Sequence, residues 1–411
     1  MRHILPALGL ALATSVVARA QNPDMQSFEV IQHGRYMATA ADCTACHTAP
    51  GGKPFAGGGA LETPFGTLLA PNITPDLQTG IGGWTDDEFV SAVKNGIGGH
   101  GIHLYPAMPY TYYTKMSRAD VLAIRAYLAT IDPVQNKVIA NQLPFPFNQR
   151  ESMIGWNVLY FNPGNLKPDP GKSAEWNRGA YLVEGAEHCG LCHTPKNAMG
   201  GDENARAMQG SVLQNWYAPN ITNNARVGVG DWSIDDIVLY LKTGRNRFGM
   251  ASGPMADAIT HSLSHVSDAD IRAIAVYLKG LPAGGGTLPQ PLPAEDPNIQ
   301  QGGVIYYNQC AACHGGQGQG IVGLFPRLAG APVVQQEQAT SLMRVVLEGS
   351  RAVGTAGAPT GPAMPSFAWK LSDDKIGAVL TYIRNAWGNA APGVQAGDVG
   401  SMRTALHDEA Q

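Results

Sequence analysis

Three segments of the chain carry two cysteines separated by two residues and followed at once by a histidine. Thiols at this spacing on one helical turn can each form a thioether with a vinyl group of a porphyrin, and the adjacent imidazole can reach the iron. One such segment could also be half of a zinc site. Three copies at domain-sized spacing use all 6 cysteines and instead predict three covalently bound haem c groups. The residues are Cys43, Cys46 and His47; Cys189, Cys192 and His193; and Cys310, Cys313 and His314.

A methionine beyond each motif is the candidate for the second axial ligand. A thioether sulfur in this position closes the iron to oxygen and peroxide and favours the ferrous state, as suits an electron carrier. Met108 and Met364 both lie in the sequence Pro-Ala-Met-Pro, whose prolines stiffen the loop. In the second segment Met255 is preferred, and Met250, on the same loop, is the alternative. We therefore predict three irons with one histidine and one methionine ligand each.

The other histidines are not expected to bind iron. His100 and His103 are rivals of Met108 for bis-histidine ligation, but they lie in a glycine-rich loop and are expected to be exposed. No motif surrounds the remaining ones, and we expect them at the surface. They are His33, His188, His261 and His265.

The surroundings of the motifs repeat. A glycine and an aromatic residue precede each motif, and each unit ends in a periodic apolar segment introduced by a serine and an acid, which is a helix N-cap pattern. A glycine in the first helix would admit the backbone of the last helix where the two cross. This crossing resembles the class I cytochrome c fold, so we expect an all-α chain of three tandem class I cytochrome c domains joined by linkers. The glycine–aromatic pairs are Gly34 and Tyr36, Gly179 and Tyr181, and Gly303 and Tyr306.

A proline beyond each histidine is expected to orient its ring. Residues 70–74 read Ala-Pro-Asn-Ile-Thr and recur at 218–222, and the third unit has Pro-Arg-Leu at 326–328. In class I cytochromes, which the units resemble, a proline carbonyl at such a place accepts a hydrogen bond from the ligand histidine and fixes its tautomer. The alternative is a plain Pro-Asn turn. The residues assigned this role are Pro71, Pro219 and Pro326.

The start of the chain predicts export. A short basic start precedes the apolar stretch 4–18, and Ala18-Arg-Ala20 is a small-x-small cleavage site, so residues 1–20 are interpreted as a cleaved signal peptide. The apolar stretch is shorter than the ~20 residues that a membrane-spanning helix needs. Because haem is attached outside the bacterial cytoplasm, export agrees with the motifs. We expect a periplasmic protein at the outer face of the inner membrane, held peripherally or through a partner.

Length and composition set the domain organisation. The 411 residues predict two to four domains, and a net charge of -4 with 15% charged residues gives no basic face for nucleic acid. The expected divisions are the signal peptide (1–20), cytochrome c domain 1 (27–131), an apolar linker (132–173), domain 2 (174–281), a Pro/Gly linker (282–298), domain 3 (299–390) and a C-terminal tail (391–411).

The first linker is too apolar to be solvated. It contains Leu-Pro-Phe-Pro-Phe at 143–147 and a further apolar run at 153–161. Such a stretch must be covered. We expect it to pack across the first two units. The alternative is that it docks on a catalytic subunit or the membrane surface through residues such as Trp156 and Phe161.

These residues together resemble a known family, the triheme cytochrome c subunits of bacterial membrane-bound periplasmic dehydrogenases for alcohol, gluconate, fructose, sorbitol or aldehyde. The resemblance runs from about Ser27 to Arg403 and is most specific at residues 39–56, 105–109, 178–195 and 387–389. In this family a separate subunit with PQQ, FAD or molybdopterin oxidises the substrate, and the triheme subunit passes the electrons to ubiquinone. The first linker looks closer to partners of flavin or molybdopterin dehydrogenases. Some alcohol-oxidising members continue well beyond residues 387–389, whereas this chain ends at Gln411.

The resemblance implies an electron-transfer subunit with no substrate chemistry of its own. Its expected partners are the dehydrogenase catalytic subunit and ubiquinone, with a peripheral association at the inner membrane. Two alternatives stay open: a haem peroxidase-like enzyme with one open or displaceable sixth position, and a free-standing periplasmic electron shuttle.

Overall fold

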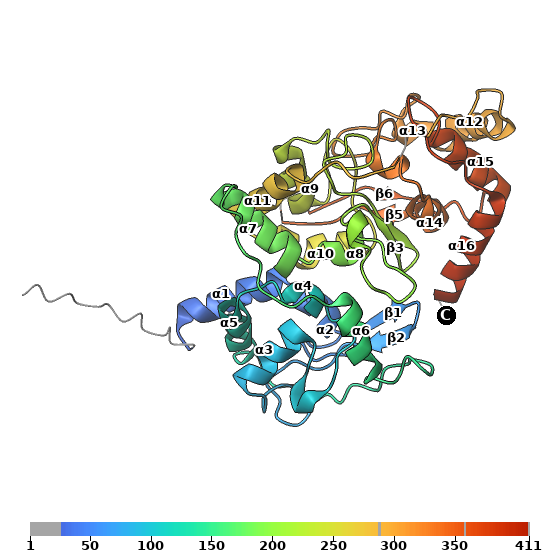
Figure 1. Ribbon diagram of the computed structural model, residues 1–411. Coiled ribbons are helices and arrows are strands. Elements are labelled where there is room, and N and C mark those ends of the chain that lie inside the picture. Colours follow the sequence, from blue (N-terminus) through green and yellow to red (C-terminus); the bar gives the residue numbers. More distant parts are fainter. Residues whose placement is uncertain (1–25, 287–288, 357–358, 410–411) are drawn as a thin grey trace, which may run out of the picture.

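The computed structural model describes residues 26–286, 289–356 and 359–409, so the predicted signal peptide lies outside the described residues. The described chain is mostly helical, which confirms the helical character expected from sequence. It also forms three two-stranded antiparallel sheets that the sequence did not predict. Figure 1 shows the N-terminal third of the chain as a blue and teal layer, with the middle and C-terminal thirds above it.

The elements of the N-terminal third are α1 (Phe28–Ala40), α2 (Cys43–His47), β1 (Ala60–Thr63), β2 (Gly66–Leu69), α3 (Asp86–Asn95), α4 (Tyr110–Tyr113) and α5 (Arg118–Leu128), followed in the linker by α6 (Ser152–Tyr160). The middle third contains α7 (Ala174–Tyr181), a π-helical turn (Leu182–Ala186), α8 (Gly190–His193), β3 (Ser211–Leu213), β4 (Trp216–Ala218), α9 (Ile234–Thr243), α10 (Pro254–His261) and α11 (Asp268–Lys279). The C-terminal third contains α12 (Pro297–Gln309), α13 (Ala311–His314), α14 (Thr340–Glu348), β5 (Ser350–Arg351), β6 (Ala363–Met364), α15 (Asp373–Ile383) and α16 (Ala396–Glu409).

Each third is built on one close crossing of two helices, α1 with α5, α7 with α11, and α12 with α15. A Cβ atom added to Gly34 would lie 1.8 Å from the carbonyl oxygen of Ala123, so only glycine fits there. Gly179 stands in the same relation to Ala273, at 2.0 Å. In the last pair the residue is Gly302, 2.1 Å from the Ala378 oxygen, and the choice of Gly303 was wrong.

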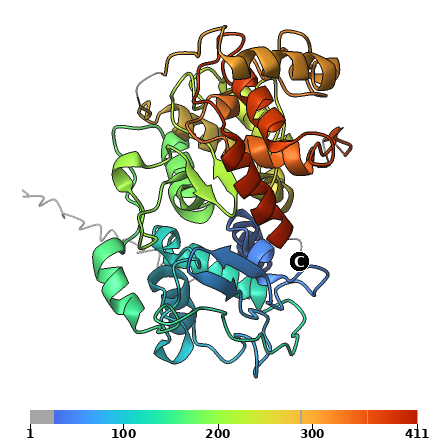
Figure 2. The same ribbon diagram turned by 90° about the vertical axis from the view of Figure 1, so that its right-hand side faces the viewer.

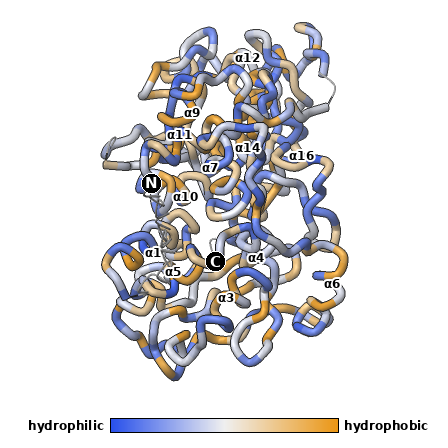
Figure 3. Tube along the Cα trace, turned by 60° about the vertical axis from the view of Figure 1, so that its left-hand side comes forward, coloured by the Kyte–Doolittle hydropathy of each residue, from blue (hydrophilic) through white to orange (hydrophobic). Residues whose placement is uncertain are grey.

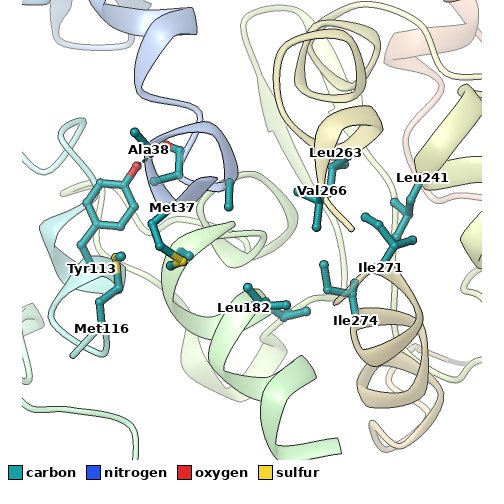
Figure 4. Packing of buried hydrophobic residues seen from close by; sticks show 14 of the residues in the cluster. Met37, Ala38, Tyr113, Met116, Leu182, Leu241, Leu263, Val266, Ile271 and Ile274 are labelled. Carbon is teal, nitrogen blue, oxygen red and sulfur yellow. Dashed lines mark hydrogen bonds between the residues drawn. The ribbon is translucent and has the colours of Figure 1, made fainter. Parts of the chain in front are cut away.

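The first two units share one hydrophobic core, which also contains Val353 of the third unit. The other buried apolar side chains of the third unit form clusters of their own. Figure 4 shows side chains of the N-terminal third, such as Met37 and Tyr113, in the same buried cluster as Leu182 and Ile274 of the middle third. The buried clusters of the C-terminal third draw only on residues beyond 304. Units 1 and 2 are therefore one packed body in physical terms, and unit 3 is added to it.

The first linker packs across units 1 and 2, as one of its two interpretations predicted. Trp156 of α6 is buried, and its Nε1 donates to the Met199 carbonyl at 2.9 Å. The neighbouring Asn157 accepts a hydrogen bond from Tyr110 of unit 1 at 2.7 Å. The other face of α6 stays open, and Figure 3 shows this helix at the edge of the molecule. Val158 and Leu159 are 82% and 70% exposed.

Two boundaries differ from the sequence-based division. α12 begins at Pro297, inside the expected Pro/Gly linker. The expected C-terminal tail contains α16, which packs on α14 and α15 and buries Val399, Met402 and Leu406 (Figure 2). No helix among the described residues is long and apolar enough to span a bilayer.

The helix crossing gives a test of the fold. Gly302→Ala is expected to lower the stability of the holoprotein by about 1–3 kcal/mol, because a methyl group must push the two backbones apart. The midpoint of thermal unfolding, followed by circular dichroism, measures the effect. Gly155→Ala in α6 is the control, since a Cβ there meets no atom within 4 Å. An unchanged midpoint for Gly302→Ala, or an equal loss for Gly303→Ala, would show that the crossing is not the constraint described.

Candidate haem sites

Each motif begins where the crossing helix ends, so the crossing sets its position. Asp42 adopts a left-handed conformation (φ 49°) between α1 and α2 and turns the chain into the first motif. In unit 2 the π-helical turn follows α7 before His188 (φ 40°) leads into the second motif. In unit 3 α12 runs directly into Cys310. All six cysteines are free thiols, as thioether formation requires.

The three motif histidines share one hydrogen-bond arrangement. The Nδ1 atoms of His47, His193 and His314 lie 2.7, 2.6 and 2.9 Å from the carbonyl oxygens of Pro71, Pro219 and Pro326, respectively. Burial lowers the pKa of each imidazole, which keeps it neutral. A neutral ring that donates from Nδ1 presents the lone pair of Nε2, which is the atom that an iron would bind.

A buried asparagine fixes the proline segment of the first unit, and sequence reasoning missed this role. The Oδ1 atom of Asn72 accepts hydrogen bonds from the backbone and hydroxyl of Thr74 at 2.9 and 2.7 Å. Its Nδ2 donates to the Val134 carbonyl at 2.7 Å, in the segment that follows α5. The residue after Pro71 thus ties the loop to the end of the unit, which holds the carbonyl that His47 needs.

The second unit repeats this pair of asparagine hydrogen bonds, here called the asparagine clamp. In the third unit the asparagine of the clamp lies after α15 instead of after the proline. Asn220 accepts from the Thr222 backbone at 2.8 Å and donates to the Gly284 carbonyl at 2.9 Å. In unit 3 the clamp comes from the other side, since Asn389 accepts from the Gly330 backbone at 2.8 Å and donates to the Leu328 carbonyl at 3.0 Å. The repeated Asn-Ile-Thr after the proline was the signal for the first two.

The candidate methionines lie in partly buried positions. Met108 and Met255 both pack against the core shared by units 1 and 2, and Met364 packs against a core of unit 3. Met250 forms an isolated β-bridge with Arg245 and does not contact that core. Met255 therefore remains the better candidate for the second iron.

The rival histidines of the first unit lie differently from each other. His100 is exposed, as expected. His103 is half-buried rather than exposed, and its Nδ1 has no hydrogen-bond partner in the structure.

The first two motifs lie against each other's methionine-bearing segments. The ring of Tyr113, in α4 just beyond Met108, stacks on His188 with 5.4 Å between centroids and 18° between planes. His188 is therefore half-buried in a unit junction, and its expected place at the surface was wrong. In return α10, whose second residue is Met255, packs on α2. The arrangement is reciprocal and brings the two attachment segments together.

Two tyrosines lock the same junction. The Tyr36 hydroxyl of unit 1 donates to Asp270 at the start of α11 at 2.6 Å, and the Tyr181 hydroxyl of unit 2 donates to Asp120 at the start of α5. These are the aromatic residues that repeat before the first two motifs. Tyr306 of unit 3 is not their equivalent, since its hydroxyl donates within its own unit to the Gly315 carbonyl at 2.6 Å.

Unit 3 meets unit 2 through the packing of α14 on β4, through Val353 in the shared core, and through backbone carbonyls and long side chains. The Gln336 amide donates to the Val227 carbonyl at 2.6 Å. The Arg327 guanidinium lies 5.7 Å from the centre of the Phe248 ring, which belongs to the loop before Met255. The segment after Pro326 thus faces the methionine loop of unit 2.

Comparison with known proteins agrees with this architecture. The cytochrome c family model matches residues 31–132 and 299–387. The chain is 38% identical to the gluconate 2-dehydrogenase cytochrome c subunit of Pantoea cypripedii over 96% of this chain and 94% of that protein. It is 38% identical to the cytochrome c subunit of the quinone alcohol dehydrogenase of Gluconobacter oxydans, over 97% and 86%. It is 35% identical to the fructose dehydrogenase cytochrome subunit of Gluconobacter japonicus, over 98% and 90%.

The unit junction is expected to weaken in acid. Burial alone would raise the pKa of Asp270, but hydrogen bonds from Arg178 and Tyr36 outweigh it and hold the pKa below its usual value. The ionised form therefore stabilises the junction above the ordinary carboxyl pKa, and this contribution disappears as the pH falls through the lowered value. Asp270→Asn should lower the thermal midpoint at pH 7, and its difference from wild type should shrink in strong acid.

Thermal unfolding of the holoprotein between pH 7 and pH 3 measures this difference. Asp268→Asn is the matched control on the same helix, because the Asp268 side chain is 89% exposed. Equal midpoints for wild type and Asp270→Asn at pH 7 would contradict a role of this pair in joining the units.

Proposed function

Because the chain belongs to the family of cytochrome c subunits of gluconate, alcohol and fructose dehydrogenases, we propose that it is the electron-transfer subunit of such a complex, with three cytochrome c domains and one haem c on each. The observation that carries the proposal is the threefold recurrence of one arrangement. Each unit combines two free thiols, a histidine whose Nδ1 is held by a proline carbonyl, and a partly buried methionine.

Each bound haem would supply an iron that accepts and releases one electron. The chain's own residues make that exchange reversible. The proline carbonyls hold the imidazole planes, and the methionines would keep water and peroxide from a bound iron. Because the proline segments and the methionine segments are tied into packed cores, these ligands would move little on a change of the iron's charge. This arrangement favours electron transfer over peroxidase chemistry.

Electrons would enter from a dehydrogenase subunit that carries PQQ, FAD or molybdopterin and leave to ubiquinone at the outer face of the inner membrane. The protein would act in the periplasm after removal of residues 1–20. Reciprocal packing of the first two motifs supports fast transfer between their haems. The contact of the Arg327 segment with the loop of unit 2 supports transfer to or from the third.

The ligand assignment gives a spectroscopic test. Met108→Ala, Met255→Ala and Met364→Ala should each abolish one of three low-spin methionine–haem signals, while pyridine haemochrome analysis still finds three haems per chain. Met250→Ala should leave all three signals. Fewer than three haems in wild type, or loss of a signal with Met250→Ala, would contradict the assignment.

The exchange itself can be reconstituted. The purified chain should accept electrons from its dehydrogenase subunit and pass them to a short-chain ubiquinone. Peroxide turnover by the chain alone would favour the peroxidase alternative, and elution as a lone monomer without detergent would favour a free shuttle. Identifying the dehydrogenase encoded next to this chain would name the substrate class.

The exposed face of α6 is the best candidate for peripheral attachment to the membrane. The helix carries no charged residue, and Ile154, Val158 and Leu159 are exposed on it. Trp156 and Phe161 face inward instead, since Trp156 is buried and the Phe161 ring packs edge-on against Tyr110. An apolar face of this kind can enter the boundary between lipid headgroups and acyl chains.

The double variant Val158→Ser, Leu159→Ser should release the holoprotein from inner-membrane vesicles without changing its haem spectra. Full burial of one such side chain is worth about 1.5–3 kcal/mol, or roughly tenfold to a hundredfold in affinity. Co-sedimentation with vesicles measures the release. Leu77→Ser is the control, as Leu77 is 77% exposed elsewhere on unit 1. Unchanged sedimentation of the double variant would rule out this face.

A further inference from the structure

Two carboxyl groups lie at the junction of the first two haem-attachment segments, Glu187 buried and Asp42 half-buried with its Oδ1 atom enclosed. Asp42 immediately precedes Cys43, and Glu187 lies two residues before Cys189. Glu187 is only 8% exposed and ends the π-helical turn that follows α7. The two residues occupy similar places in their units. α10 packs on α2, which begins after Asp42, and α4 packs on the π-helical turn that Glu187 ends.

Neither carboxyl has a cationic partner, and each has an unused oxygen. Glu187 Oε2 lies 3.3 Å from the Ser262 hydroxyl, which is also 3.3 Å from the Ala40 carbonyl. Glu187 Oε1 and Asp42 Oδ1 are buried and accept no hydrogen bond. Among the ion pairs of the described chain none involves Asp42 or Glu187. Ionised Glu187 would lose its hydration with nothing to replace it, and ionised Asp42 would lose it at the buried Oδ1 atom.

The surrounding charges add to this effect. Burial, and then repulsion from Asp257 of α10, raise the pKa of Asp42 to about 8. Burial, and then repulsion from Asp42, raise the pKa of Glu187 well above its usual value. Asp270 also faces Glu187, but Arg178 pairs with it at 2.7 Å.

The other titratable neighbours do not supply a charge. The Tyr113 hydroxyl donates to the Ala41 carbonyl at 2.6 Å, and burial raises its pKa, so it stays neutral. Burial lowers the pKa of His188, so it too stays neutral. The cysteines of both motifs lose their acidity once they form thioethers.

The carboxyls lie close to both attachment segments. Burial, and then the charge of Asp42, raise the pKa of the Cys43 and Cys46 thiols. Cys192 of the second motif acts on Cys46 in the same way. A change of charge on either haem would therefore act on the carboxyls through a medium with little water to screen it.

We propose that Asp42 and Glu187 form a proton-binding pair that couples reduction of the first two haems to proton uptake. When a ferric iron gains one electron from the dehydrogenase and becomes ferrous, one carboxylate of the pair takes one proton from solvent and becomes a carboxylic acid. The charge of the junction then stays constant. On transfer of the electron to the next carrier, the acid releases its proton. The proposal rests on the loading of units 1 and 2 with haem.

The test is a spectroelectrochemical titration of the full holoprotein between pH 5.5 and pH 9.5. In the acidic part of the range the pair is already protonated, and the potentials should be flat. Above it, the potential of one or both of the first two haems should fall as the pH rises, by up to about 59 mV for each tenfold drop in proton concentration. The double variant Asp42→Asn, Glu187→Gln should lose this slope.

A graded variant separates the effect from a folding defect. Ser262→Ala removes the hydrogen bond that favours ionised Glu187, so the onset of the slope should move to higher pH while the slope itself remains. Infrared difference spectra between the reduced and the oxidised holoprotein should show a carboxylic acid band in wild type. Glu187→Gln should change this band. Asp235→Asn, whose side chain is 93% exposed, is the control for a general change of charge.

The outcomes are distinct. Flat potentials in wild type, or a slope that persists in the double variant, overturn the proposal. Haem analysis of the same samples reports separately on the proposed function, because fewer than three haems would overturn that function whatever the slopes. The third haem is the internal standard, as Gln309 precedes Cys310 and no acidic side chain is buried in unit 3 among the described residues.

Discussion

The close crossing of the first and last helix of each unit is the constraint on which the other features depend. At Gly34, Gly179 and Gly302 the backbones meet with no room for a side chain. The crossing places the end of the first helix, and each motif begins within a few residues of that end. It also places the segment beyond the last helix, where Val134 and Gly284 receive the asparagine clamps. The histidine–carbonyl geometry is thus set at the crossing.

Units 1 and 2 are joined to each other by hydrogen bonds that unit 3 does not form. A few residues account for this difference. The tyrosine two residues after the crossing glycine and the acid three residues after the N-cap serine reach across the junction in both directions. In unit 3 these positions carry Val304 and Lys375, which cannot form the same bonds, and Val304 is 64% exposed. Two units therefore share a core, and the third contributes only Val353 to it and keeps its own clusters, with α16 packed over them.

The sequence predicted the histidine–proline contacts better than the surroundings of the motifs. Cysteine, histidine and proline positions follow from local spacing, and the structure contains the three histidine–proline hydrogen bonds. Spacing could not show which of Gly302 and Gly303 lies at the helix crossing, because the number of residues between the crossing glycine and the motif differs from unit to unit. Nor could it give the partners of Tyr36 and Tyr181, which lie more than 200 and about 60 residues away and depend on how units dock. His188 was misjudged for the same reason.

The chain contains two kinds of buried ionisable group, which differ in the polar groups around them. Arg384 of unit 3 is fully buried and donates to the carbonyls of Gln336, Glu337 and Pro392. Burial lowers its pKa to about 10, so it stays charged at neutral pH with only peptide dipoles around it. At the junction of units 1 and 2, Glu187 is buried and Asp42 half-buried with no cationic partner, and burial raises the pKa of both. A fixed charge and such a pair would respond differently to a nearby electron, because only a group near its own pKa can follow its arrival.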